Sequence, residues 1–224
     1  MNEGQKKGLC AENISLAYHD GSDVTLAVRG VTIDLAETGF VGILGPSGSG
    51  KSSLLYLLGG LKRASSGEIY HNGCAYSEMK EKERLRLRRN HYGFVFQQSY
   101  LFDYLTAMEN ALAGASPGDD QALARAMEIF EELGIARHAK KRPRQLSGGE
   151  RQRVCIARAM MNSPSVIFAD EPTAALDRQN GHRVMEMLAA YRDRGLIIVV
   201  THDTAMLDEC DRIYRMRDGT LQEN

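Results

Sequence analysis

Three short apolar runs stand out along the chain, and each is followed directly by residues that could bind a ligand or take part in a reaction. The runs span residues 40–44, 165–169 and 196–200 and are rich in valine and isoleucine. A strand that is covered on both faces, as in a parallel sheet, shows this kind of unbroken apolar pattern. Because functional groups collect at the carboxyl ends of parallel strands, the residues after each run are the first candidates for a site.

Elsewhere, apolar residues recur at helical spacing. Residues 51–58, 121–133 and 149–161 carry Ala, Leu, Met, Ile and Phe on one side, with charged residues between them in the last two segments. Glycine and proline at 117–120 and proline at 140–143 indicate loops around the second of these segments. The middle of the chain is therefore predicted to be mostly helical.

The earliest segment, residues 8–35, has two alternating stretches on either side of a polar turn at 19–23, which is typical of an antiparallel hairpin. Taken together, the patterns predict an α/β fold with a mainly parallel core sheet and an N-terminal antiparallel β subdomain. We expect one domain over residues 1–224, with a helical subdomain inserted at residues 98–163.

Composition limits the class of function. The 224 residues include 28 Lys plus Arg and 29 Asp plus Glu, a formal charge of −1 that gives no reason to expect a nucleic-acid partner. The longest apolar runs fall far short of the roughly 20 residues that cross a bilayer. Residues 1–8 lack the apolar core of a secretory signal, so we expect a cytoplasmic protein. The four cysteines show no CxxC spacing, which argues against zinc and against a disulfide framework.

A glycine-rich loop follows the first apolar run and leads into the first helical pattern. It fits the pattern GxxxxGK[ST] and lies between a predicted strand and a predicted helix, the context that gives this motif meaning. Glycines allow successive backbone N–H groups to surround phosphate oxygens, and a plain glycine turn is the alternative. We expect the lysine to reach the β- and γ-phosphates and the last serine to bind Mg²⁺. The loop consists of Gly45, Pro46, Ser47, Gly48, Ser49, Gly50, Lys51 and Ser52.

Two adjacent carboxylates end the second apolar run. Asp170 is expected to serve the Mg²⁺ ion, and Glu171, which diverges from it at the strand end, is expected to act on an attacking water. A solvated acidic turn is the alternative. A second glycine-rich loop, made by Ser147, Gly148 and Gly149, precedes another predicted helix. Taken alone, it is equally well an anion site or a helix cap with Ser147 as N-cap.

In combination, the motifs resemble those of the nucleotide-binding subunit of an ABC transporter, over about residues 9–221. Six motifs occur in the family's order: the phosphate loop at 45–53, the Q-loop at 94–98, the signature at 146–154, Walker B at 166–173, the D-loop at 174–177 and the switch at 201–203. The resemblance implies a P-loop NTPase core, ATP and Mg²⁺ as cofactors, and a head-to-tail dimer that encloses two nucleotides. It also implies a separate membrane permease, with this subunit peripheral on the inner face of the membrane.

The family resemblance also implies roles for individual residues of the site. It implies catalytic roles for Glu171, His202, Lys51 and Gln97, and Mg²⁺ contacts from Ser52, Gln97 and Asp170. It implies nucleotide contacts from Tyr18, which would stack on adenine, and from residues 45–53, Ser53 included, Ser147, Gly148, Gly149 and Asp177.

Some of these expectations have alternatives. Tyr18 is alternatively a packed strand tyrosine, and Gln98 lies beside Gln97. The basic run at 84–89 invites a nucleic-acid or lipid interpretation, but a solvated helix fits a near-neutral chain better. The departures from the family, such as Gly39 followed by Phe40, remove no catalytic group.

Residues 88–111 resemble most the subfamily that serves lipoprotein release and macrolide or peptide efflux. Residues 99–105 are expected to receive a coupling helix of the permease, although a core role for Leu101, Phe102 and Leu105 is equally consistent. A transport ATPase is therefore the leading hypothesis. A cell-division or envelope regulator of the same fold is the alternative, and a soluble P-loop kinase ranks third.

Overall fold

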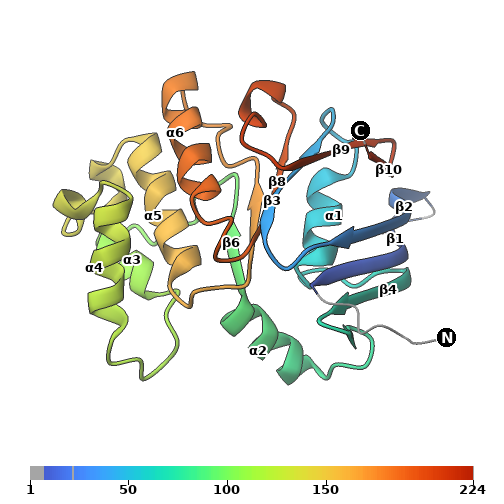
Figure 1. Cartoon of the computed structure of the whole chain (residues 1–224), viewed down its shortest axis with the longest axis horizontal. Coiled ribbons are helices and arrows are strands. Elements are labelled where there is room, and N and C mark those ends of the chain that lie inside the picture. Colours follow the sequence, from blue (N-terminus) through green and yellow to red (C-terminus); the bar gives the residue numbers. More distant parts are fainter. Residues whose placement is uncertain (1–7, 22, 224) are drawn as a thin grey trace.

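A computed structural model describes residues 8–21 and 23–223, and Ser22 of the predicted hairpin turn lies outside them. Two sheets organise this part of the chain (Figure 1). The smaller is antiparallel, in the order β2-β1-β4-β5, and the larger has the order β10-β9-β3-β8-β7-β6. Their strands are β1 (Leu9–Asp20), β2 (Asp23–Leu35), β3 (Gly39–Leu44), β4 (Ser66–His71), β5 (Cys74–Ala75), β6 (Tyr92–Val95), β7 (Val166–Asp170), β8 (Leu196–Thr201), β9 (Arg212–Arg217) and β10 (Thr220–Glu223).

The three apolar runs pair as neighbours in the larger sheet. Strands β3, β8 and β7 run parallel, with Leu44 beside Thr201 and Asp170 beside Val200. The carboxyl ends of these strands therefore meet at one edge. The antiparallel hairpin is also present, since β1 pairs with β2 up to the Asp20 and Asp23 pair. The predicted α/β fold class, with its mainly parallel sheet and antiparallel N-terminal sheet, is confirmed.

The helices cover the sheets in two layers. The α-helices are α1 (Lys51–Leu58), α2 (Glu81–His91), α3 (Ala107–Leu112), α4 (Ala122–Glu132), α5 (Gly148–Met160) and α6 (Arg178–Ala189). Short 3-10 turns are η1 (Ala136–His138), η2 (Pro143–Gln145) and η3 (Thr204–Met206). Helix α1 lies between the two sheets, whereas α3, α4, α5 and α6 lie on the opposite face of the larger sheet (Figure 1). The three helical segments predicted at 51–58, 121–133 and 149–161 agree with α1, α4 and α5 to within one residue at each end, whereas α3 and α6 were not predicted individually.

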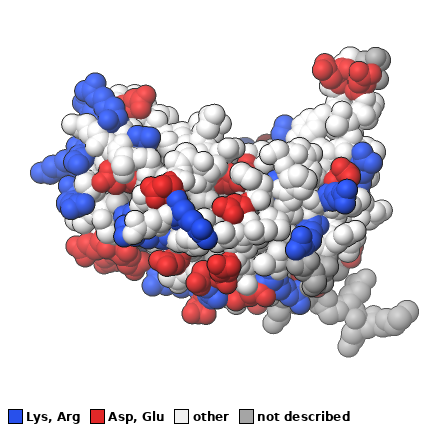
Figure 2. Space-filling view, turned by 90° about the horizontal axis from the view of Figure 1, so that it is seen from above, with Lys and Arg blue, Asp and Glu red and all other residues white. Residues whose placement is uncertain are grey.

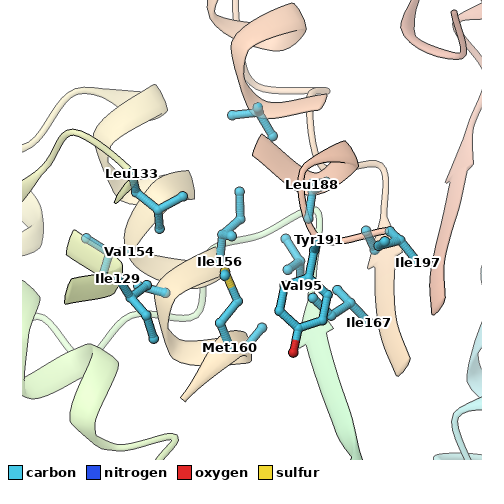
Figure 3. Packing of buried hydrophobic residues seen from close by; sticks show 14 of the residues in the cluster. Val95, Ile129, Leu133, Val154, Ile156, Met160, Ile167, Leu188, Tyr191 and Ile197 are labelled. Carbon is cyan, nitrogen blue, oxygen red and sulfur yellow. The ribbon is translucent and has the colours of Figure 1, made fainter. Parts of the chain in front are cut away.

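Each face of the larger sheet has its own apolar core. Leu54, Leu55 and Leu58 of α1 pack with inward residues of both sheets on one side. On the other side, Ile156 of α5 and Leu188 of α6 pack against the sheet (Figure 3). Burial of both faces explains why the central strands lack polar alternation. It also holds the strand ends rigidly around the loops that follow them.

Helices α3, α4 and α5 lie within the stretch that was expected to form an inserted subdomain, residues 98–163. They share their core with β6, β7 and α6, so the stretch packs continuously onto the larger sheet. A single domain over residues 1–224 with a separate helical subdomain at residues 98–163 therefore stays a proposal. None of the helices in the described part of the chain is long and apolar enough to cross a membrane.

Candidate functional site

The phosphate loop connects β3 to α1, and its glycines are required by the backbone packing. Gly50, the N-cap of α1, has φ of 101°, and a Cβ atom there would lie 2.1 Å from the carbonyl oxygen of Ala27. A Cβ atom at Gly45 would lie 2.2 Å from the carbonyl oxygen of Met216. Pro46, Ser47 and Gly48 are exposed, so the loop opens to solvent above a closely packed base. The N–H groups of Gly45 and Ser49 donate to the carbonyl oxygens of Thr201 and Pro46. The remaining loop N–H groups and the N-terminus of α1 are suited to bind an anion.

Lys51 returns over this loop instead of extending into solvent. Its side chain is only 6% exposed, and Nζ donates a hydrogen bond to the carbonyl oxygen of Pro46 at 3.0 Å. Nζ also lies 3.8 Å from Oε1 of Glu171. The ammonium group is therefore held at the loop, beside one of the two carboxylates that follow β7.

Asp170, the last residue of β7, is 5% exposed and accepts two hydrogen bonds from α1. The Ser52 hydroxyl donates to Oδ1 at 2.7 Å, and the Tyr56 hydroxyl donates to Oδ2 at 2.6 Å. Burial, followed by the hydrogen bond to Asp170, raises the pKa of Tyr56 above its ordinary value, so the phenol stays protonated and donates. Tyr56 was missed in the sequence, where its position four residues after Ser52 was the available signal.

Glu171 has partners of its own. Its backbone is left-handed, with φ of 45°, and its side chain is 12% exposed. Oε2 accepts a hydrogen bond from the Thr201 hydroxyl at 3.2 Å, and Nδ1 of His202 lies 3.0 Å from both carboxylate oxygens. The carboxylate thus faces Lys51, Thr201 and His202, whereas Asp170 faces α1. Thr201 had been noted as part of a motif but had not been given a role.

Other predicted residues lie around the mouth of the loop. Tyr18 is 39% exposed on β1, so it is not a packed core residue. Its hydroxyl lies 3.3 Å from Oγ of Ser53, and Nζ of Lys62 lies 5.4 Å from the centre of its ring. Gln97, just beyond β6, and its neighbour Gln98 are both exposed, so the geometry does not distinguish between them.

The signature loop is built differently. Ser147 is exposed and is the N-cap of α5 in a capping box: its hydroxyl accepts from the N–H of Glu150 at 3.2 Å, and its own N–H donates to Glu150 at 2.7 Å. Asp177 likewise caps α6 and accepts from the N–H of Asn180 at 3.0 Å. The capping hydrogen bonds of Ser147 and Asp177 stay inside their own helices, and Oε1 of Glu150 also lies 2.9 Å from Nε2 of His138 in η1. The structure therefore does not bring Ser147, Gly148, Gly149 or Asp177 together with the phosphate loop of the same chain.

The oxygen atoms of Ser52 and Asp170 are of the kind that Mg²⁺ binds. No group of three or more His, Cys, Asp or Glu side chains in the described part of the chain forms a metal site by itself. Mg²⁺ commonly completes its shell with water and substrate phosphate oxygens, and the phosphate loop lies beside Ser52. The donor set therefore fits Mg²⁺ bound together with a nucleotide.

Residues 28–174 match the family model described as ABC transporter. This chain belongs to the ABC transporter family. It is 41% identical over 217 residues to the uncharacterized ABC transporter ATP-binding protein MJ1508 of Methanocaldococcus jannaschii, covering 95% of this chain and 97% of the relative. It is 40% identical to the macrolide export ATP-binding/permease protein MacB of Escherichia coli K12, and the match covers 95% of this chain but about a third, 34%, of that protein.

Solved structures agree with this assignment. The dimeric structure of a post-hydrolysis state of the ATP-binding cassette MJ0796, bound to ADP and Pi, aligns with a TM-score of 0.87 at 35% identity. The alignment covers 96% of this chain and 98% of that cassette. A second dimeric structure of MJ0796 aligns with a TM-score of 0.88. These matches confirm the expectation that the chain is an ABC ATPase, most similar to the subfamily that includes the macrolide exporter MacB.

Proposed function

We propose that the chain is an ATP-binding and ATP-hydrolysing subunit that powers a membrane permease of an ABC transporter. The observation that carries the proposal is the convergence of Lys51, Asp170 and Glu171 behind an open glycine loop. This set supplies a cation for phosphate, a carboxylate for a metal and a second carboxylate for water, which are the groups that phosphoryl transfer needs. A cassette of the same fold with ADP and Pi bound supports hydrolysis as the reaction.

Each residue has a role in this mechanism. The N–H groups of the loop that follow Pro46 and the Lys51 ammonium bind the phosphates, while Ser52, Asp170 and Gln97 would hold Mg²⁺. Bound Mg²⁺ would supply neutralisation of the phosphate charge. Glu171 orients and polarises the attacking water, and His202 stabilises the charge on the γ-phosphoryl group.

Several contacts support these roles. Thr201 and His202 keep the Glu171 carboxylate from rotating. The His202 side chain is 57% exposed, so a bound nucleotide could reach it. Tyr18 presents a half-exposed ring for stacking on adenine, and the nearby Lys62 ammonium adds positive charge.

We further propose that two copies pack head to tail around two ATP molecules. Ser147, Gly148 and Gly149 of one copy would then cap the γ-phosphate held by the phosphate loop of the other, with Asp177 at the same interface. The exposed position of Ser147 at the N-terminus of α5 supports this arrangement, although Gly149 is buried within its own chain. The dimeric form of the MJ0796 cassette supports it as well.

The membrane partner is proposed to dock on a groove between β6 and α5. The groove has a volume of about 540 Å³, and Phe96, Tyr100, Arg88 and Arg158 contribute to its lining. The neighbouring Phe102 and Tyr104 are 45% and 71% exposed, as interface anchors would be, whereas Leu101 packs against the core. The relative MacB is a macrolide export ATP-binding/permease protein. We therefore propose that this chain powers an exporter and lies at the inner face of the membrane.

The test is the variant Glu171→Gln. It should bind ATP as the native chain does, hydrolyse it at least ~100-fold more slowly because the water loses its base, and accumulate as a dimer. ATP turnover and size-exclusion chromatography measure these effects. Glu186→Gln, an exposed change on α6, is the matched control and should leave turnover unchanged. Near-normal turnover in Glu171→Gln would exclude the proposed role of this carboxylate.

The permease can be identified separately. Affinity purification of the chain from native membranes should recover a membrane protein with the spans of an exporter. Recovery of an envelope-enzyme regulator instead would favour the alternative in which ATP hydrolysis controls cell-envelope enzymes.

A further inference from the structure

Tyr56 makes a contact to which the mechanism above gives no role. It lies one turn after Ser52 on α1, so the two hydroxyl groups project from the same side of the helix. They donate to different oxygens of one carboxylate, Ser52 to Oδ1 and Tyr56 to Oδ2 of Asp170. Hydrogen bonds to a charged carboxylate are stronger than neutral ones, and two of them from fixed positions prevent its rotation.

The Tyr56 ring is in turn held by a second ring. Its centroid lies 6.3 Å from that of Phe96, at an interplanar angle of 59°. Phe96 follows β6 directly and precedes Gln97, and its ring lies edge-on to Tyr100 at 5.7 Å. Tyr100 is 64% exposed and lines the groove between β6 and α5. A continuous series of ring contacts therefore connects this groove with the hydroxyl that touches Asp170.

The Tyr100 end of this series is itself anchored. Tyr100 has a left-handed backbone, with φ of 41°. The Arg158 guanidinium of α5 donates to the carbonyl oxygens of Tyr100 and Ser99, at 2.8 and 2.9 Å. The backbone that carries the Tyr100 ring is thus fixed to the helix that begins at the signature loop.

We propose that Tyr56 is a positioning residue that orients the Asp170 carboxylate for Mg²⁺, and that the Phe96 ring sets the position of Tyr56. The inference rests on the proposed ATPase function. It predicts that the hydroxyl of Tyr56 affects the Mg²⁺-dependent part of nucleotide binding and leaves the Mg²⁺-independent part unchanged. The phosphate loop and Lys51 do not contact Tyr56 through any described hydrogen bond, so they should bind phosphate equally well without it.

The direct test compares Tyr56→Phe, which removes one oxygen and keeps the ring, with Tyr191→Phe. The Tyr191 hydroxyl is buried and donates to the carbonyl oxygen of Pro164 at 3.0 Å, so this control loses a comparable hydrogen bond elsewhere. Binding of a fluorescent ATP analogue is measured in EDTA and then across a titration of free Mg²⁺. The Mg²⁺ concentration at half-saturation should rise ~10-fold in Tyr56→Phe, as when a neighbour that orients a metal ligand is lost. Affinity in EDTA should stay as in the native chain, and Tyr191→Phe should behave as the native chain in both measurements.

Phe96→Leu tests the second half of the proposal with the Tyr56 hydroxyl left in place. It should raise the Mg²⁺ half-saturation by on the order of 3-fold, again without a change in EDTA. Thermal unfolding confirms that each variant is folded, and if Tyr56→Phe is not, Phe96→Leu decides the question alone. The inference is overturned if the Mg²⁺ concentration at half-saturation is unchanged in either folded variant. It is also overturned if the affinity for the ATP analogue in EDTA falls by the same factor. Absence of ATP-analogue binding by the native chain, with or without Mg²⁺, would instead contradict the proposed function.

Discussion

Both glycine-rich loops lead into a helix, yet their surroundings differ. Around the phosphate loop, Lys51, Asp170 and Glu171 come from separate segments and contact one another or the same helix within a single chain. At the signature loop, the polar groups of Ser147 are satisfied by Glu150, one turn along the same helix. One loop lies in an assembled half-site, whereas the other is only a capped helix end.

The glycines of the two loops also differ in whether the packing of the chain requires them. A side chain at Gly50 would collide with the backbone at 2.1 Å, so this glycine is needed for the chain itself to fold. At Gly148 and Gly149, a Cβ atom would meet neighbours at 3.4 and 3.5 Å, which is ordinary contact. Nothing in the packing of the described chain requires these two glycines. Their presence supports the proposal that this loop meets the nucleotide held by a second copy.

Charge on the surface is less informative than these local differences. Figure 2 shows Lys and Arg interspersed with Asp and Glu over the face it presents. The specific charges of the site come instead from the buried ammonium of Lys51 and the buried carboxylate of Asp170. The chemical contrast between the two loops is therefore a matter of a few side chains, and it can be tested one side chain at a time.

The largest expected effect comes from disabling the phosphate loop in one chain and the signature loop in another, and then mixing the two chains. Lys51→Ala removes the ammonium and should reduce ATP turnover by ~10²–10³-fold, as loss of one fixed charge-stabilising group does in other enzymes. Ser147→Arg should bind ATP and still dimerise but hydrolyse ATP as slowly, because a large cation displaces the loop from the γ-phosphate held by the partner. An equimolar mixture should recover activity, since a mixed dimer joins the intact phosphate loop of one chain to the intact signature loop of the other.

The recovered turnover should be roughly a quarter of the native value, because half of the dimers are mixed and each has one intact site. ATP turnover of the mixture against each variant alone measures it. A mixture that stays as inactive as its components, although mixed dimers form, would show that the loops do not combine between chains.

The next effect compares two glycines. Gly50→Ala places a side chain at a left-handed position against a carbonyl oxygen and should lower the free energy of unfolding by about 1–3 kcal/mol. Gly149→Ala, inside the first turn of α5, should leave stability the same or raise it by up to about 1 kcal/mol, because alanine favours a helix. Denaturant unfolding measures both, and ATP turnover should nevertheless fall in Gly149→Ala. Normal turnover there would mean that the signature glycine has no external role.

Much of this fold follows from local patterns in the sequence. Unbroken apolar runs predicted β3, β7 and β8, and the polar residues after them predicted where Asp170 and Glu171 lie. These predictions succeed because burial on both faces and the end of a strand are properties of a short segment. The sequence motifs likewise identified both glycine-rich loops.

Contacts between distant segments were not predictable in this way. The bond from Tyr56 to Asp170 joins residues 114 positions apart and depends on how α1 packs against β7. The left-handed backbone of Glu171 and its hydrogen bond from Thr201 depend similarly on the register of β7 and β8. The choice between Gln97 and Gln98 stays a prediction from the family resemblance, because both side chains are exposed.

The smallest effect concerns how each helix start is stabilised. Helix α1 has no side-chain cap, whereas α5 is capped through the ionised Glu150. The N–H of Ser147 is the main cause that holds the pKa of Glu150 below its ordinary value. A carboxyl group with a lowered folded-state pKa stabilises the fold fully above its unfolded value, about 4.3, and loses that contribution as the pH falls through the folded value. The start of α5 should therefore be acid-sensitive in a way that the start of α1 is not.

Glu150→Gln tests this difference, because the amide can still accept a hydrogen bond but carries no charge at the helix N-terminus. At pH 7 the variant should be less stable by about 0.5 kcal/mol, the usual contribution of one charge to a helix end. Thermal unfolding of both chains across pH should show a gap in Tm at pH 7, where burial keeps the neighbouring His138 uncharged by lowering its pKa. The gap should close below about pH 4.3 as the native carboxylate takes up its proton. Glu109→Gln, the same change in the capping box of α3, should show the same closing gap without any loss of ATP-dependent dimerisation. A gap that persists at pH 3 would mean that Glu150 stabilises the loop by its shape and not by its charge, and the signature loop would then resemble the phosphate loop in depending on packing alone.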